Sequence, residues 1–392
     1  MTRRQKFRQY MACMSAAADP KLAIEREFYV PPPDAISDRI VKRLEIEPSS
    51  RHLIVGSIGA GKTTQLLIAQ KHLEGLEDVH ALYVDVSERH DLTQLRPGCL
   101  VALAGIALDN MLGRQSINAP DWPSFKSWAS GYWTFPYDDY HDEYDDGSKF
   151  VQGIIKPPTS WPDIPQNIVS IFSQTTRLMM NQGPNLILLF DSLDRVTNRD
   201  AFSKIVEQDV AALHGAGIGL VLIGPIRSLE GFGRLDADRF DYLHVQAPID
   251  VGQDEKGREF LLQVLHRRAG PGILSDTAAE QLVQLSGGVL RDLIALAKSA
   301  GDEAYSRGAD TIDRDHVMMA ADGFGRALMV GLKPEEIDTL KHLHSTGGFV
   351  RTSDDDLALI ATRRVLEYRG RQPQYAVHPT ISHLLDQLAE RP

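Results

Sequence analysis

The chain has 392 residues, of which 43% are hydrophobic and 24% are charged. These proportions are ordinary for a globular protein, and the length suffices for two or three domains, while no apolar stretch approaches the length needed to cross a bilayer. The formal net charge of −11 argues against broad, non-specific binding to nucleic acid.

Residues 1–30 are predicted to form a helical N-terminal arm that ends at the triple proline 31–33. The first eight residues are basic, but no apolar segment follows them, so the pattern is not that of a secretory signal. Cys13 and Cys99 are the only cysteines and lack C-x-x-C spacing. We therefore expect a cytoplasmic protein without a structural zinc site.

A phosphate-binding motif follows a short strand. Residues 56–63 match G-x-x-x-x-G-K-[ST], the P-loop, between an apolar strand at 52–55 and a helical pattern at 64–70. Glycines let consecutive N–H groups turn toward phosphate oxygens, and the following helix adds partial positive charge at its N-terminus. The predicted phosphate-binding residues are Gly56, Ser57, Ile58, Gly59, Ala60, Gly61, Lys62, Thr63 and Thr64.

Two side chains of this motif have distinct predicted roles. Lys62 should reach the β- and γ-phosphates of a nucleotide, and the Thr63 hydroxyl should ligate Mg²⁺.

Strands and helices alternate on both sides of the P-loop, which predicts a parallel sheet covered on both faces. We expect one α/β domain over residues 31–250. The predicted strands after the P-loop are 79–86, 185–191, 219–224 and 242–247, and the predicted helices are 34–44, 92–112, 164–181 and 200–213.

Residues 113–165 interrupt this alternation and are predicted to be an insertion. All four tryptophans lie there, together with an acidic run at 138–146. The segment is interpreted as a poorly ordered loop, a docking surface for a partner, or a metal site. Docking is favoured because exposing several tryptophans to water is energetically costly. A metal site is disfavoured because the acidic run lacks the spaced glycine of an EF-hand loop. His141, among the acids, is interpreted as a surface residue.

The apolar strand 185–191 ends in an acid, Asp191, and a second acid, Asp194, follows three residues later. A carboxylate at a strand tip can hold Mg²⁺, and a second can polarise an attacking water. We assign Asp191 to the metal and Asp194 to the water. The alternative is a buried strand followed by an Asp-rich turn.

Together these motifs resemble those of AAA+ P-loop ATPases, near the branch that contains the Orc1/Cdc6 initiators and the STAND signalling ATPases. The D-x-x-D spacing of Asp191 and Asp194 is more STAND-like than an adjacent Asp-Glu pair. The resemblance covers about residues 30–325. It implies a helical lid at 251–325, and ATP with Mg²⁺ as the ligands.

The resemblance also suggests roles for three arginines. Arg291, in a helix after Gly287 and Gly288, matches the sensor 2 arginine that reaches the γ-phosphate. The alternative is a glycine cap followed by a solvated arginine. Arg239, or alternatively Arg234, matches the arginine finger offered to a neighbouring subunit.

One departure from the AAA+ pattern concerns the strand that ends at Gly224, where a polar sensor 1 residue is expected. The chain there reads Gly224-Pro225-Ile226-Arg227 instead. Either Arg227 takes the place of the sensor 1 residue, or the hydrolysis of ATP is slow.

Residues 333–392 are predicted to form a winged-helix-like domain of two helices, a hairpin and a final helix. Four arginines on the wing could contact phosphates, although residues 334–392 carry nine acidic residues against seven Lys or Arg. A winged helix can also dock proteins or autoinhibit. The wing arginines are Arg363, Arg364, Arg369 and Arg371.

The leading functional hypothesis is an ATP-binding, slowly hydrolysing switch that self-associates with nucleotide and controls a protein partner. The alternative is a nucleotide-dependent DNA-binding protein that resembles initiators or transposition regulators and binds through the winged helix. A small-molecule kinase is disfavoured because the chain has no acceptor-site motif and carries a lid and a C-terminal hairpin unit. Neither hypothesis involves a membrane.

Overall fold

The computed structural model describes residues 1–15, 20–112, 121–129, 164–180, 185–229, 234–370 and 373–389. The chain divides into two compact units. The sheet unit comprises residues 36–55 and 65–244, and the helical unit comprises residues 1–35, 56–64 and 245–392.

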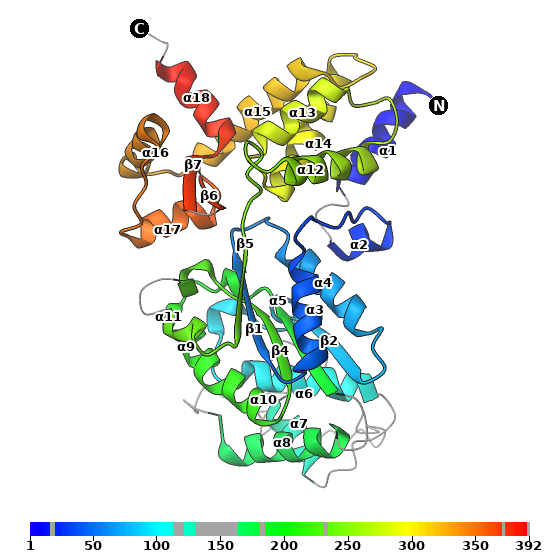
Figure 1. Cartoon of the computed structure of the whole chain (residues 1–392), viewed down its shortest axis with the longest axis vertical. Coiled ribbons are helices and arrows are strands. Elements are labelled where there is room, and N and C mark those ends of the chain that lie inside the picture. The colour runs from blue at the N-terminus through cyan, green and yellow to red at the C-terminus, as the bar shows by residue number, and fades with distance from the viewer. Residues whose placement is uncertain are drawn as a thin grey trace, which may run out of the picture. The chain divides into compact units, whose positions relative to one another are not determined.

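Five strands form the sheet, which Figure 1 shows with its surrounding helices. They are β1 (Arg51–Gly56), β2 (Val79–Asp85), β3 (Asn185–Asp191), β4 (Gly219–Ile223) and β5 (Tyr242–Gln246). Their order is β2-β3-β4-β1-β5, and β1 with β4, β2 with β3, and β3 with β4 pair in parallel. Every residue of β4 is buried, as expected for a strand inside a sheet that is covered on both faces.

Two helices flank the P-loop in sequence and share one apolar cluster with the sheet. They are α3 (Ile36–Ile46) and α4 (Lys62–Leu73). Ile40 of α3 and Leu66 of α4 pack with Ile54, Ile187 and other buried strand residues. The remaining helices of this region are α5 (Val86–Arg89), α6 (Cys99–Leu112), α7 (Trp122–Ala129), α8 (Gln166–Met180), α9 (Arg199–Ile205), α10 (Ala211–Gly215) and α11 (Arg234–Ala237), with the short helical turns η2 (Leu92–Gln94), η3 (Leu193–Arg195), the π-helical η4 (Val206–Val210) and η5 (Ile226–Leu229).

The helix predicted from residue 92 begins later, at Cys99. Residues 92–94 form the separate turn η2, and Gly98 adopts a φ of +96°. The carboxylate of Asp209 then accepts hydrogen bonds from the N–H groups of Gly98, Leu100 and Val101 at 2.8, 2.8 and 3.1 Å. A residue from the π-helical turn η4 therefore caps α6, because the first-turn N–H groups need acceptors.

Part of the predicted insertion belongs to the core. Trp122 is buried, stacks on Phe125 with ring centroids 4.6 Å apart, and donates from Nε1 to Asp109 at 3.1 Å. Phe125 stacks in turn on Phe172 of α8. The reading of this whole segment as a loop is therefore wrong for residues 122–129. Trp133, Trp161, His141 and the acidic run lie outside the described residues.

The helical unit contains α12 (Glu255–Ala269), α13 (Asp276–Leu285), α14 (Leu290–Ser306) and α15 (Arg314–Met329), where the lid is predicted. The N-terminal helices α1 (Arg3–Ser15) and α2 (Pro20–Glu25) belong to the same unit. Tyr10 of α1 is buried and donates to the carbonyl oxygen of Ala297 at 2.7 Å, and α1 lies beside α14 (Figure 1). The helical arm predicted from the sequence thus contributes to this apolar core.

The C-terminal residues form two helices, a hairpin and a final helix. They are α16 (Pro334–Thr346), α17 (Asp354–Ala361), β6 (Val365–Arg369), β7 (Pro373–Val377) and α18 (Pro379–Ala389). β6 and β7 pair antiparallel, with Val365 opposite Val377. We call residues 333–389 the winged-helix segment. The predicted fold class, an α/β P-loop NTPase sheet with a helical lid and a C-terminal winged helix, is confirmed.

Candidate functional site

The P-loop connects β1 to α4 and has the backbone shape that its glycines predict. Gly59 and Gly61 adopt φ angles of +85° and +97°, a region that residues with a side chain rarely occupy. A Cβ on Gly59 would also lie 2.7 Å from the Cβ of Arg291. Both the backbone conformation and the close approach of a neighbouring helix therefore require glycine at this position.

The polar groups of the loop suit an oxyanion ligand. Lys62 is only 5% exposed, and its Nζ donates to the carbonyl oxygens of Gly56 and Ser57 at 2.9 Å each. The buried Ser57 hydroxyl has no hydrogen-bond partner, and Thr63 and Thr64 are half-buried in the first turn of α4. A buried ammonium, an unpaired buried hydroxyl and the N–H groups of a helix N-terminus are the donors that phosphate oxygens accept.

Asp191 occupies the tip of β3 and is buried. Its Oδ2 accepts a hydrogen bond from the Tyr83 hydroxyl at 2.8 Å, and its Oδ1 accepts one from the Ser192 N–H at 2.6 Å. Ser192 has a φ of +73°, which is strained for a residue other than glycine. The strand ladder and the strained turn thus hold the carboxylate in one orientation.

Asp194 lies two residues beyond Ser192, in η3, and is half-buried. Because β1 and β3 run parallel in one sheet, the turn at Asp191 and Asp194 leaves the same edge of the sheet as the chain that follows β1. Each acid therefore lies at the sheet edge where α/β proteins bind ligands.

Tyr83 was not identified from the sequence. It lies on β2, whose register places Tyr83 opposite Leu189 and Asp85 opposite Asp191. Burial raises the pKa of Tyr83 and the neighbouring Asp191 raises it further, so the hydroxyl keeps its proton and acts as the donor. Asp85 has a different task, because it accepts from Ser87 and caps α5. The alternation of side chains along β2, which places Tyr83 and Asp85 on one face of the sheet, is the sequence pattern that could have indicated Tyr83.

Arg291, predicted as sensor 2, is the second residue of α14. Its N–H donates to the carbonyl oxygen of Gly59 at 3.2 Å, and its side chain is exposed. The helical unit therefore brings Arg291 to the P-loop, where the sequence places the phosphates.

The Gly287-Gly288 turn before α14 has a packing role that the sequence did not reveal. Both residues have positive φ. A Cβ on Gly288 would lie 1.8 Å from the carbonyl oxygen of Ile249, which is far closer than van der Waals contact allows. A Cβ on Gly287 would lie 2.2 Å from Cδ1 of Leu366 in β6. The hydroxyl of Tyr368, also on β6, donates to the carbonyl oxygen of Gly287 at 3.1 Å. The glycines therefore let the hairpin pack directly on the turn that leads to Arg291.

Arg239 follows α11 in the sheet unit and is exposed. Its guanidinium lies 3.4 Å from a carboxylate oxygen of Glu207, with 46% and 61% of the two side chains exposed. Such an exposed ion pair contributes little to stability in water. The side chain of the alternative, Arg234, lies outside the described residues.

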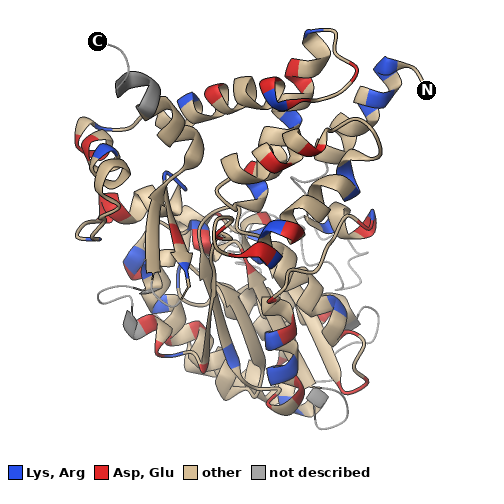
Figure 2. Cartoon of the chain, turned by 45° about the horizontal axis from the view of Figure 1, so that its top comes forward, with Lys and Arg blue, Asp and Glu red and all other residues tan. Residues whose placement is uncertain are grey.

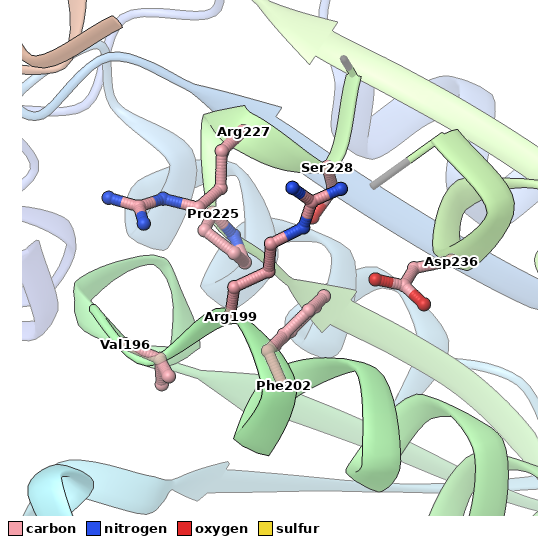
Figure 3. A pocket seen from close by; sticks show the side chains of 7 residues that line it. All are labelled: Val196, Arg199, Phe202, Pro225, Arg227, Ser228 and Asp236. Carbon is pink, nitrogen blue, oxygen red and sulfur yellow. The ribbon is translucent and has the colours of Figure 1, made fainter. Parts of the chain in front are cut away.

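The expected sensor 1 position lies beside a small pocket in the sheet unit. Arg227, in η5, donates to the carbonyl oxygen of Thr197 at 3.1 Å. The buried Ser228 hydroxyl has no hydrogen-bond partner, and Asp236 accepts from Ser203 at 2.6 Å. Figure 3 shows the residues that line this pocket: Val196, Arg199, Phe202, Pro225, Arg227, Ser228 and Asp236.

Three of the four arginines that the sequence places on the wing have acceptors within the chain. Arg363 pairs with Asp292 at 3.1 Å, and Arg369 pairs with Glu367 at 2.9 Å. Arg364 donates to the carbonyl oxygens of Leu328 at 2.7 Å and Val330 at 3.2 Å, and Arg371 lies outside the described residues. Intramolecular acceptors therefore hold Arg363, Arg364 and Arg369. Figure 2 colours the charged residues of the chain: helix α16 contains both acidic and basic residues, whereas α17 contains three acidic residues and no Lys or Arg.

Within the described residues, no group of three or more His, Cys, Asp or Glu side chains could hold a metal ion. Among the described helices, none combines the length and the apolar character that crossing a membrane requires.

Several solved structures resemble the chain. Cdc6p of Pyrobaculum aerophilum aligns over 92% of this chain and 94% of its own, with 13% identity and a TM-score of 0.43. Aeropyrum pernix Orc1, solved in complex with DNA, aligns over 92% and 93%, with 16% identity and a TM-score of 0.40. Thermotoga maritima RuvB aligns over 91% and 93%, with 15% identity and a TM-score of 0.40.

No protein-family model matches the chain, and no curated protein matches it by sequence. The resemblance to Orc1/Cdc6 proteins predicted from the sequence is thus also found among solved structures.

Proposed function

We propose that the chain binds ATP with Mg²⁺, hydrolyses it slowly, and acts as a molecular switch of the AAA+/STAND kind. The observation that supports this most directly is the P-loop. Gly59 and Gly61 have positive φ, Lys62 is buried at the start of α4, and the buried Ser57 hydroxyl is unpaired. These groups form a donor-rich turn of the kind that holds a triphosphate.

The remaining roles follow from where each side chain lies. Lys62 would contact the β- and γ-phosphates, and Arg291, beside Gly59, would contact the γ-phosphate. Mg²⁺, held through Thr63 and Asp191, would supply charge neutralisation at the phosphate oxygens. Asp194 would orient and polarise the attacking water.

Slow hydrolysis is consistent with the chain after β4. The expected polar sensor 1 residue is replaced by Gly224-Pro225, and Arg227 is engaged with Thr197. A site that lacks one electrostatic contact to the transferring phosphoryl group loses transition-state stabilisation. The nucleotide would then serve mainly to set the conformation of the lid and the winged-helix segment.

Such a switch controls its own assembly or a protein partner. We propose nucleotide-dependent self-association in which Arg239 reaches the nucleotide site of a neighbouring subunit. We also propose a cytoplasmic location, because Cys13 and Cys99 are free thiols. DNA binding through the winged-helix segment is the alternative. The resemblance to Aeropyrum pernix Orc1, which was solved with DNA, is the reason to test it.

The test compares nucleotide binding with turnover. Calorimetry with ATP in magnesium buffer should show association that Lys62→Ala abolishes, whereas Asp194→Asn should retain binding and lose turnover by about 10² or more, the range typical of lost general-base catalysis. Phosphate release is measured with and without duplex DNA.

Lys71→Ala is the matched control, because Lys71 lies on the exposed last turn of the same helix α4. Wild-type levels of binding in Lys62→Ala would place the nucleotide elsewhere. Strong stimulation of turnover by DNA would favour the DNA-binding alternative.

A further inference from the structure

The turn between α17 and β6 lies against the P-loop within the helical unit. The N–H of Ile58 donates to the carbonyl oxygen of Ala361 at 3.3 Å. In return, Nη1 of Arg363 donates to the carbonyl oxygen of Ile58 at 3.3 Å. Both backbone polar groups of Ile58 are therefore bound by the winged-helix segment, and this part of the P-loop moves only if these bonds break or the segment follows.

Arg363 also contacts the start of α14. Its Nε lies 3.1 Å from Oδ2 of Asp292, and Nε2 of the buried His378 lies 3.4 Å from the same oxygen. These are ion-pair distances without hydrogen-bond geometry. Asp292 is 1% exposed and directly follows Arg291. One guanidinium therefore joins the P-loop, the helix that carries Arg291, and the hairpin.

The backbone at this junction is tightly constrained. Arg363 has a φ of +67°, a conformation that costs a residue with a side chain of order 1 kcal/mol or more. A Cβ on Gly59 would lie 3.0 Å from Nη1 of Arg363. The contacts of the arginine hold this strained conformation, and the P-loop accommodates the guanidinium only because residue 59 lacks a side chain.

We propose that Arg363 is a positioning residue that couples the winged-helix segment to nucleotide binding. It holds Ile58 of the P-loop and, through Asp292, the start of the sensor 2 helix in one arrangement. Loss of these contacts loosens both halves of the phosphate-binding region and speeds nucleotide release. The inference rests on the proposed function, because it requires that the P-loop bind a nucleotide.

The neighbouring residue offers a matched control. Arg364 belongs to the same turn and is also bonded to backbone carbonyls, but its acceptors are Leu328 and Val330 at the end of α15. Replacing Arg364 therefore disturbs the attachment of the winged-helix segment without touching the P-loop contact. The methionine variants of Arg363 and Arg364 keep an unbranched side chain and remove the donors.

The experiment measures release of a fluorescent ADP analogue with Mg²⁺ from the full-length chain by stopped flow. In Arg363→Met we expect the release rate to rise about tenfold or more, because a hydrogen bond from a charged donor is lost. Arg364→Met should stay within about twofold of the wild type. Asp292→Asn combined with Arg363→Met should show less than the product of the two single effects, since both act through one contact.

A second variant guards against misfolding. Arg363→Gly suits the positive φ, so the turn should form readily while the side-chain contacts are absent. Faster release in this variant as well supports the proposal. A wild-type release rate in both Arg363 variants, or the same acceleration in Arg364→Met, would overturn it. Absence of analogue binding by the wild type would instead remove the proposed function, and is seen before any variant is compared.

Discussion

Tyr83 on β2 donates a hydrogen bond of 2.8 Å to Asp191 at the tip of the neighbouring strand β3. The two residues come from separate parts of the sequence and meet because β2 and β3 pair in parallel with Asp85 opposite Asp191. The carboxylate proposed to hold Mg²⁺ is thus oriented by a phenol that burial keeps protonated.

Replacing Tyr83 by Phe tests this orientation. The variant keeps the ring and removes the donor, so Asp191 loses one partner while it remains buried. We expect a loss of about 1–3 kcal/mol in the free energy of unfolding, measured by urea denaturation. We also expect the Mg²⁺ concentration that gives half-maximal ATP turnover to rise several-fold.

The control for this prediction is Tyr242→Phe. Tyr242 is also on a strand of the sheet, but its hydroxyl donates to Glu47 at 3.1 Å in an exposed hydrogen bond. An unchanged magnesium requirement in Tyr83→Phe would mean that the phenol serves folding alone.

The parts of the fold that the sequence predicted well are those with local signals. The P-loop, the acid at the end of β3 and the hairpin depend on motifs and periodicities within about ten residues. The start of α6 was misplaced because its cap, Asp209, comes from a distant turn. Long-range acceptors of this kind leave no local pattern.

The candidate site shows the same division. Lys62 and Asp191 were predicted as site residues from motifs, whereas Tyr83 was missed because its contact with Asp191 depends on strand register. Arg363 was identified as a charged residue and given a DNA-facing role. The structure instead places it on the P-loop, because the sequence does not specify which carbonyl groups an arginine will meet.

The packing of the hairpin on the Gly287 turn predicts the effect of adding one methyl group. Gly287→Ala would place Cβ 2.2 Å from Leu366 and force a positive φ on alanine. We expect a cost of about 1–3 kcal/mol from overpacking and about 1 kcal/mol from the backbone, measured by urea denaturation.

Gly308→Ala separates these two terms. Gly308 has a φ of +79° but nothing lies within 4 Å of its Cβ position, so only the backbone cost applies. If both variants lower the free energy of unfolding equally, the hairpin moves to accommodate the added methyl group and overpacking contributes nothing.

A pair of buried histidines predicts how stability changes with pH. His52 and His244 stack, with Nδ1 of His52 3.0 Å from Nε2 of His244. Burial lowers the pKa of His52 to about 3, with a further lowering from His244, and burial lowers the pKa of His244 to about 4. In the folded state both rings therefore stay neutral at pH 5, whereas in the unfolded state both take up protons below about pH 6.5.

The difference in proton uptake between the folded and unfolded states decides how stability changes with pH. Because the unfolded chain binds more protons, the free energy of unfolding falls as the pH drops from about 6.5 toward 4, by up to about 1.4 kcal/mol per pH unit for each histidine. Above pH 7 the two histidines do not change the free energy of unfolding with pH. His244→Gln should reduce this slope between pH 6 and 5. The slope is measured by urea denaturation at each pH, and an undiminished slope in His244→Gln would contradict the assignment.

Arg239 allows self-association to be tested apart from nucleotide binding. The residue is exposed and its ion pair with Glu207 is weak, so Arg239→Ala should leave the stability of the monomer within about 0.5 kcal/mol. If the arginine enters the nucleotide site of a neighbour, ATP should shift the sedimentation coefficient of the wild type, and this variant should weaken the shift. Glu207→Ala removes the ion pair but keeps the arginine, so it should retain the shift. A wild-type particle that stays monomeric at saturating ATP, or equal weakening in both variants, would show that Arg239 acts only within its own chain.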